Sequence, residues 1–115
     1  MKLLLIVVSL LISVKSWAEP PALNCDLGPA NKIYGGTPWL VYGCNDQHSV
    51  VVVTAPNSPA VPFYFMFAYS NGSYRLQGEG TGDKTKTDAA YADLRKFTNI
   101  QIARLFSEAS NTLKK

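Results

Sequence analysis

Four stretches in the middle of the chain carry apolar residues either in a continuous run or in alternation with polar ones. Three of them are dense in Val, Phe, Tyr and Trp, at 39–44, 49–54 and 63–69. The fourth, 73–79, alternates after Asn71-Gly72, the dipeptide that most strongly favours a two-residue hairpin turn. β-Branched and aromatic residues favour extended structure. The pattern therefore predicts four strands joined as an antiparallel meander.

The hydrophobic period lengthens after the last of these stretches. Ala90, Leu94 and Phe97 recur at helical spacing, and Thr98 with Gln101 matches a capping box. The residues that follow form an apolar stripe made of Ile102, Leu105, Phe106, Ala109 and Leu113. This spacing is typical of a helix with one buried face. We expect two helices, at 86–97 and 99–113.

Strands followed by helices favour an α+β domain. The expected architecture is a four-stranded antiparallel β-meander followed by two C-terminal α-helices packed on one face, in a single domain over 39–115. The preceding segment, 19–38, is rich in Pro, Gly, Ala and Asn and has no sustained period. We expect it to form an irregular arm.

The first residues match a secretory signal peptide. Lys2 is followed by an apolar run over 3–14, and Ser16 and Ala18 place small residues at the positions that signal peptidase reads. The run is too short for a membrane span, which needs about 20 residues. We expect cleavage of 1–18, a periplasmic or secreted protein, and no membrane association after cleavage.

Removal of this leader also removes most of the positive charge. The whole sequence has eleven Lys and Arg against eight Asp and Glu, a net charge of +3. Without Lys2 and Lys15, nine basic residues face eight acidic ones and the net charge is +1. A nucleic-acid partner is therefore not expected, because such partners select strongly basic domains.

The sequence has two cysteines, Cys25 and Cys44. An oxidising compartment favours a disulfide between them, which would tie the arm to the first predicted strand. A redox pair normally uses Cys-x-x-Cys, and zinc needs further ligands, for which His48 is the single histidine available. We expect no metal and no cofactor.

Two of the predicted strands are apolar on both faces, although an antiparallel sheet with one wet face should alternate. In 63–69, one face carries Phe63, Phe65, Phe67 and Tyr69, and the other carries Tyr64, Met66 and Ala68. The helices can cover only one face. We expect the arm, a second copy or a protein partner to cover the other, and we take Phe63, Phe65, Phe67 and Tyr69 as the candidate apolar interface.

The glycine-rich segment before the first helix resembles a phosphate-binding loop at first sight. It runs Gly78-Glu79-Gly80-Thr81-Gly82-Asp83-Lys84-Thr85, with Asp83 where that motif requires glycine. This excludes a nucleotide-hydrolysing loop. A weaker possibility is a small anion or ligand held by backbone amides at Gly80, Gly82, Asp83 and Lys84.

Catalytic groups are not evident. Asp46 and His48 could form an acid–base pair, but turn chemistry explains them as well. The aromatic residues of the sheet could form a stacking platform for a ligand, although core packing explains them too. We expect no catalytic residues and no enzyme activity.

Two short segments resemble a known family. Tyr42-Gly43-Cys44-Asn45-Asp46, followed by the valine-rich strand, is similar to the opening strands of the C-type lysozyme inhibitor family, and the turn at 70–74 is similar to a loop of that family. The two predicted C-terminal helices depart from the family's small barrel. The resemblance assigns no functional residue here.

Together these features predict a small exported, non-catalytic binding protein, most simply a protein-binding one of the inhibitor or immunity type, or else a homodimer. The alternative is a periplasmic binder of a small ligand or anion, through the loop 78–84 or the aromatic face of the sheet.

Overall fold

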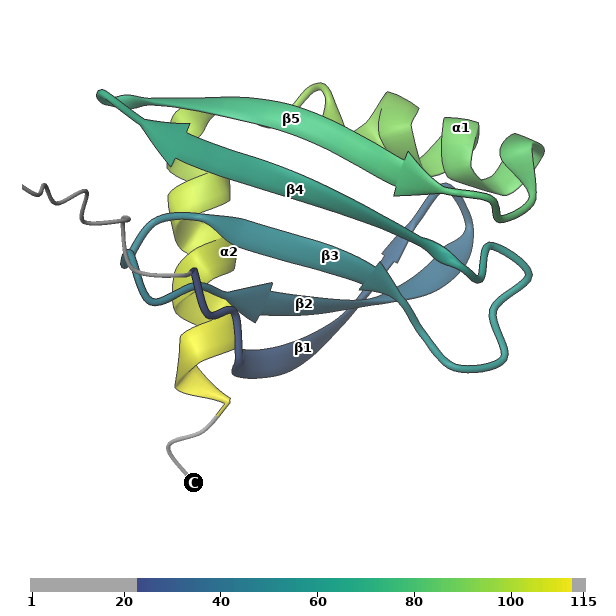
Figure 1. The fold of residues 1–115 in the computed structure, drawn as a ribbon, viewed down its shortest axis with the longest axis horizontal. Coiled ribbons are helices and arrows are strands. Elements are labelled where there is room, and N and C mark those ends of the chain that lie inside the picture. The colour runs from purple at the N-terminus through teal and green to yellow at the C-terminus, as the bar shows by residue number, and fades with distance from the viewer. Residues whose placement is uncertain (1–22, 113–115) are drawn as a thin grey trace, which may run out of the picture.

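The structure is a computed structural model, and it describes residues 23–112 (Figure 1). The predicted leader, 1–18, and the first residues of the predicted arm lie outside these described residues. Five strands come first, at Leu27–Tyr34 (β1), Thr37–Gly43 (β2), Val50–Thr54 (β3), Phe63–Ser70 (β4) and Ser73–Gly80 (β5). Two helices follow, Lys84–Leu94 (α1) and Asn99–Asn111 (α2).

The strands form one antiparallel sheet in the order β1-β2-β3-β4-β5. Each strand pairs with the one before it in sequence, so the sheet is a simple meander, visible in Figure 1. The α+β class and the antiparallel meander are confirmed. The predicted number of strands is wrong, because the sheet has five strands where four were expected.

The additional strand is β1, which lies inside the segment predicted as an irregular arm. The prediction of irregular structure is therefore wrong for Leu27–Tyr34, which form β1, and for residues 37–38, where β2 begins. β1 contains Pro29 after a cis peptide bond, and its register shifts between Leu27 and Ala30. Proline is tolerated in an edge strand, where one backbone side needs no partner. Gly28 and Pro29 interrupt the alternation of apolar and polar residues by which a strand is recognised in a sequence.

The helices begin at residues that satisfy their free amides. At α1 the Asp83 side chain accepts a hydrogen bond from the Thr85 amide. At α2 the Thr98 side chain accepts from the Gln101 amide, and the Gln101 side chain accepts from the Thr98 amide. This is the capping box that the sequence predicts.

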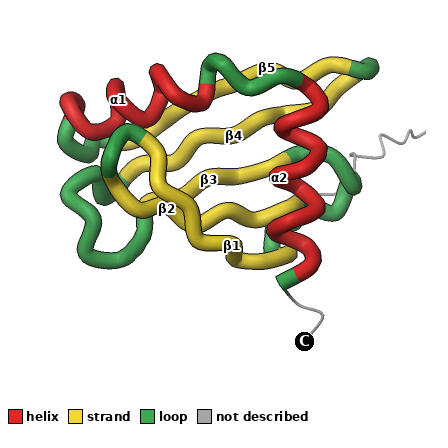
Figure 2. The backbone as a smooth tube through the Cα atoms, turned by 180° about the vertical axis from the view of Figure 1, so that it is seen from behind, coloured by secondary structure: helices red, strands yellow, loops and turns green. Residues whose placement is uncertain are grey.

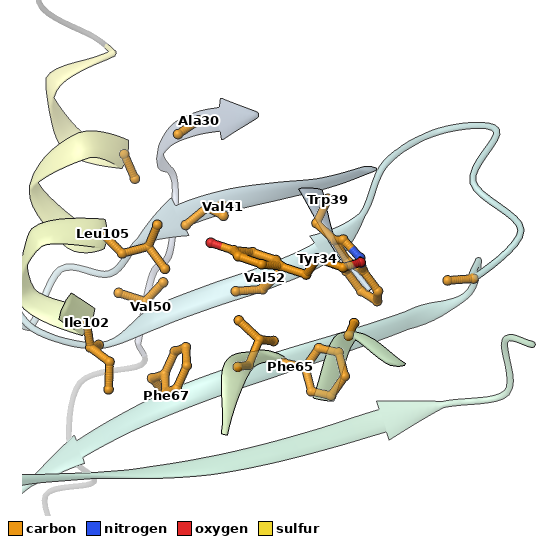
Figure 3. Packing of buried hydrophobic residues seen from close by; sticks show 14 residues of the cluster. Ala30, Tyr34, Trp39, Val41, Val50, Val52, Phe65, Phe67, Ile102 and Leu105 are labelled. Carbon is orange, nitrogen blue, oxygen red and sulfur yellow. The ribbon is translucent and has the colours of Figure 1, made fainter. Parts of the chain in front are cut away.

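One hydrophobic core contains buried residues of the sheet and of both helices. The inner face of the sheet contributes Trp39, Val41, Val50, Val52, Phe65 and Phe67, and the helices contribute Ala90, Leu94, Ile102, Leu105 and Ala109. Figure 3 shows Val41, Val50 and Phe67 beside Ile102 and Leu105 of α2, whereas Trp39 and Phe65 lie farther along the sheet, where Phe65 contacts Tyr91 of α1. In Figure 2 both helices lie on the same side of the sheet.

Trp39 is fully buried, and its indole nitrogen donates to the Tyr34 carbonyl at 3.2 Å and to the Thr37 hydroxyl at 3.1 Å. A tryptophan thus fills the core with its polar atom satisfied. Across residues 23–112, none of the helices combines the length and the apolar character that a membrane crossing requires.

Candidate functional site

The candidate site lies on the outer face of the sheet, opposite the helices. Alternate residues of the three central strands point outward there, and they are Leu40, Tyr42, Val51, Val53, Tyr64 and Met66. Register places Leu40, Val53 and Tyr64 in one row across the sheet and Tyr42, Val51 and Met66 in the next. We call these six residues the outer band. All six are half-buried or exposed.

The outer band is not the set of residues predicted as an interface. Phe65 and Phe67 are 2% exposed and belong to the core, and Phe63 packs against that core. Tyr69 stacks on His48 at the end of the sheet. The prediction that one face of β4 remains uncovered by the helices was made for the wrong face, because the helices cover the phenylalanine side.

A signal for the correct face was present in the sequence. The Asn71-Gly72 turn fixes the β4–β5 register, so that Phe67 lies opposite Leu76 and Met66 opposite Gln77. The polar residues of β5, Arg75, Gln77 and Glu79, therefore share a face with Tyr64 and Met66. The alternation in β5 marks that face as the outer one.

At one end of the outer band the surface contains a hollow of about 410 Å³. Its lining is mainly apolar and consists of Val53, Thr54, Val61, Pro62, Phe63, Tyr64, Glu79 and Gly80. Val61 is 47% exposed and Tyr64 is 41% exposed, so both remain accessible at the rim. Glu79 supplies the single charged side chain among these residues.

Hydrogen bonds hold the loop that forms one wall of this hollow. The Pro62 carbonyl accepts from the amides of Thr81 and Gly82, each at 3.0 Å. The Ser58 hydroxyl accepts from the Ala60 amide at 3.1 Å, and both of these residues are buried. A wall fixed in this way loses little conformational freedom when a ligand binds.

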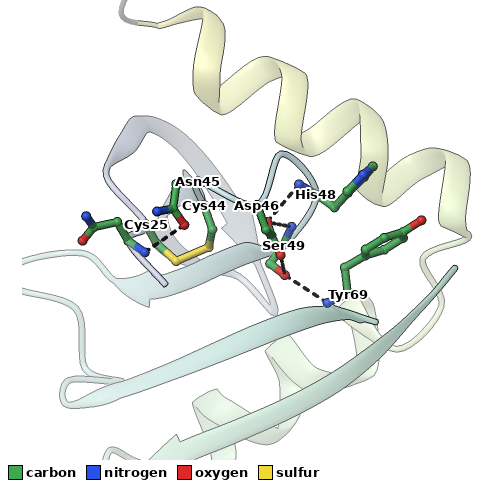
Figure 4. The surroundings of a disulfide bond; sticks show 8 residues. Cys25, Cys44, Asn45, Asp46, His48, Ser49 and Tyr69 are labelled. Atoms are coloured by element: carbon green, nitrogen blue, oxygen red, sulfur yellow. Dashed lines mark hydrogen bonds between the residues drawn. A yellow bond between two sulfur atoms is a disulfide. The ribbon is translucent and has the colours of Figure 1, made fainter. Parts of the chain in front are cut away.

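The disulfide between Cys25 and Cys44 is present, as predicted (Figure 4). Beside it, the Asn24 amide donates to the Asn45 side chain at 3.1 Å, and the Asn45 amide donates to the Asn24 carbonyl at 2.8 Å. These contacts tie the segment before β1 to the end of β2. With the disulfide formed, neither cysteine is a free thiol.

Asp46 organises the turn between β2 and β3 (Figure 4). Its carboxylate accepts from the amides of His48 and Ser49, at 3.0 and 2.7 Å, and from the Ser49 hydroxyl at 2.5 Å. Burial by itself would raise the pKa of Asp46, but these hydrogen bonds outweigh burial and lower the pKa below its ordinary value. The carboxylate is engaged in holding the turn.

His48 contacts Asp46 through its backbone amide, while its imidazole stacks on the Tyr69 ring with 4.0 Å between ring centroids. In the described structure the imidazole of His48 forms no hydrogen bond with the Asp46 carboxylate, so the two side chains are not arranged as an acid–base pair. Both residues fit the turn explanation.

The aromatic residues do not form one platform. Trp39, Phe65 and Phe67 lie in the core, and Tyr42 and Tyr64 lie in the outer band. In a third group at the end of the sheet, the Tyr69 ring stacks on His48 and makes an edge-to-face contact with Tyr74. Burial, followed by the nearby Tyr69 and Asp46, raises the pKa of Tyr74.

Several donors of the glycine-rich loop and of the first turn of α1 are already engaged within the protein. The amides of Thr81 and Gly82 already bond Pro62, and the amides of Lys86 and Thr87 bond the Asp83 carbonyl. Asp83 itself occupies the helix N-terminus, and hydrogen bonds from the Thr85 side chain and amide lower its pKa. Lys84 pairs with Asp88 at 3.3 Å. This geometry disfavours an anion at Gly80, Gly82, Asp83 and Lys84.

Residues 23–112 hold no cluster of three or more His, Cys, Asp and Glu side chains suited to a metal ion. No protein-family model matches the chain, and comparisons with curated proteins and with solved structures found no significant match. The similarity to the C-type lysozyme inhibitor family therefore remains confined to two short segments.

Proposed function

We propose that this protein is an exported, non-catalytic binding protein that holds another protein against the outer face of its sheet. The observation that carries the proposal is the apolar outer band with the hollow at its end. Large exposed apolar patches are uncommon on monomeric proteins, and Val61 and Tyr64 keep apolar side chains accessible on this face. An inhibitor or immunity-type role, in which the bound target is occluded, fits a protein that acts by contact alone.

The shape of the surface favours a protein partner over a small ligand. Val53 and Tyr64 belong both to the hollow and to the outer band, so the hollow opens onto a broad apolar surface. A partner can insert one apolar side chain into the hollow and cover the band around it. Burial of one Leu-sized side chain contributes about 2 kcal/mol, and such central anchors dominate many interfaces.

Export rests on the predicted leader. The disulfide between Cys25 and Cys44 is compatible with an oxidising compartment. Among the described residues, the lack of a helix that could cross a membrane is compatible with the same location. The periplasm, or the medium outside the cell, is therefore the compartment in which a partner should be sought.

Photo-cross-linking in the producing cell tests this proposal. A photoreactive phenylalanine derivative replaces Tyr64, which is 41% exposed on the outer face. The matched control replaces Tyr91, which is 44% exposed and lies on α1. We expect a discrete adduct with one other protein from position 64 and none from position 91. Equal labelling from both positions, or no protein adduct from position 64, would contradict the proposal.

The alternative of a small-ligand binder fits the hollow better than the loop 78–84, where Asp83 places a carboxylate. The residues of the hollow would then enclose a small apolar molecule, and the rest of the outer band would have no role. The two functions differ in what the native protein carries when it is isolated.

A further inference from the structure

β5 is an open edge of the sheet. It pairs with β4 on one side, and on its other side no described strand pairs with it (Figure 1). An open edge presents unpaired backbone amides and carbonyls, which can pair with a strand of another molecule. Most residues of β5 are exposed.

The opposite edge of the sheet, β1, carries features that block pairing with another strand, whereas β5 lacks them. β1 carries Pro29 and an irregularity between Leu27 and Ala30, and its Lys32 forms an ion pair with Glu108 of α2. Proline and bulges are common means of blocking edge-to-edge pairing. β5 runs for eight residues, Ser73–Gly80, with no proline, and its register with β4 is continuous.

The charges on β5 are self-complementary. Arg75 and Glu79 both point to the outer face, two residues before and two residues after Gln77. They are about 13 Å apart along an extended strand, and neither takes part in an ion pair within residues 23–112. If two β5 strands meet antiparallel with Gln77 opposite Gln77, each Arg75 lies directly opposite the other copy's Glu79.

We propose that two copies of this chain associate through antiparallel β5–β5 pairing centred on Gln77. Directly opposed residues of antiparallel strands have Cβ atoms about 5 Å apart, where opposite charges stabilise and like charges destabilise the pair. The symmetry of the arrangement forms the Arg75–Glu79 pair twice. A parallel pairing in register would instead place Arg75 opposite Arg75, with repulsion.

On the inner face of β5, side-chain size is complementary between the two copies: large residues of one strand lie opposite glycines of the other. Its first half carries Tyr74 and Leu76, and its second half carries Gly78 and Gly80. In the proposed register Leu76 lies opposite Gly78 of the other copy, and Tyr74 lies opposite Gly80. The rings of Phe63 and Phe65 lie over Gly78, so the incoming leucine would meet an aromatic surface.

Association in this register would join two five-stranded sheets into one continuous sheet, with both outer bands on the same face. The inference does not rest on the proposed function, because it concerns backbone pairing along β5; Glu79 and Gly80 are shared with the lining of the hollow. A failure of one would therefore leave the other intact. Residues outside the β5 edge, such as Val61 in the hollow, should not affect the association.

Charge reversal tests the register. Arg75→Glu and Glu79→Arg chains, each produced from the full 115-residue sequence, would place like charges opposite each other in their own homodimers. We expect each variant alone to dimerise at least about tenfold more weakly than wild type by sedimentation. An equimolar mixture should restore dimers, because all opposed pairs in the mixed dimer are again of opposite charge. Far-UV circular dichroism and thermal melting establish that both variants remain folded.

A cysteine trap gives a second readout. Gln77→Cys should form a disulfide-linked dimer on mild oxidation, since the two residues face each other at the symmetry axis. Ser73→Cys is the matched control, because its two copies would lie about 26 Å apart. A wild-type chain that is monomeric at all concentrations would overturn the proposal. So would reversal variants that dimerise like wild type, a mixture that fails to recover, or equal cross-linking at 73 and 77.

Discussion

At the scale of single residues, the Asp46 carboxylate holds the β2–β3 turn and, through Ser49, connects that turn to β4. It accepts three hydrogen bonds from the turn, and the Ser49 hydroxyl that donates to it accepts in turn from the Tyr69 amide at 3.0 Å. Ser49 is 1% exposed, so this connection between the turn and β4 is shielded from water. Hydrogen bonds to a charged group in such a setting are stronger than neutral ones.

Asp46→Ala should lower the free energy of unfolding at pH 7 by about 1–2 kcal/mol. The folded pKa lies below the unfolded value of about 3.9. The ionised carboxylate therefore stabilises the fold above that pH and loses this contribution as the pH falls through the folded pKa. The variant should accordingly lose less stability than wild type between pH 5 and the acid range, as followed by urea unfolding.

Asp26→Ala, at an exposed carboxylate, is the control for the loss of a negative charge. If the Asp46 and Asp26 variants show the same stability at pH 7 and the same acid dependence, the turn role of Asp46 is wrong.

Residue chemistry was the part of the site that the sequence predicted best. The Cys25–Cys44 disulfide and the capping box at Thr98 depend on residue type and short spacing, and both are present. The face on which Phe65 and Phe67 point was predicted wrongly. Alternation within β4 alone gives two apolar sets and does not show which one the helices cover. The register with the alternating strand β5 was needed to identify the outer face.

At the scale of elements, the turn between β1 and β2 is fitted closely against α1. Gly35 has φ +59°, and a Cβ atom there would lie 2.4 Å from the Ala90 nitrogen. The Gly35 amide also donates to the Asp93 side chain at 2.7 Å. The neighbouring Gly36 has φ +79°, and a Cβ atom at that position would have no other residue within 4 Å apart from its chain neighbours.

Gly35→Ala and Gly36→Ala form a matched pair that measures this fit. Both place alanine at a positive φ, which costs about 1 kcal/mol. Gly35→Ala adds a backbone clash with α1, so we expect a loss of about 3 kcal/mol against about 1 kcal/mol for Gly36→Ala. Urea denaturation gives both values. Equal losses would mean that α1 does not pack against this turn.

Element prediction succeeded where periodicity was strong. The strands β2 to β5 and both helices lie within a few residues of their predicted ranges. β1 was missed because Gly28, Pro29, Asn31 and Lys32 carry little strand signal of their own. That strand forms through pairing with β2 and packing under α2, which are contacts distant in sequence.

At the scale of the whole molecule, the outer band is an apolar surface that the helices do not cover, with Tyr64 exposed and its other five residues partly buried. The helices cover one face, and β1 extends the sheet at its edge. Most of the described part of the predicted arm, from Leu27 onward, forms β1, the following turn and the start of β2, so it is used in the sheet. A partner remains the simplest cover for this surface.

Native mass spectrometry of the protein, recovered gently from its own compartment, shows whether such a partner is bound. The wild-type chain should carry one foreign protein at equal stoichiometry. Val61→Asp, at the exposed rim of the hollow, should lose it, whereas Ile100→Asp, at a 70% exposed site on α2, should keep it. A chain that carries no protein, carries only a small-molecule mass, or keeps its partner in the Val61→Asp variant would contradict a protein-binding role for the outer band.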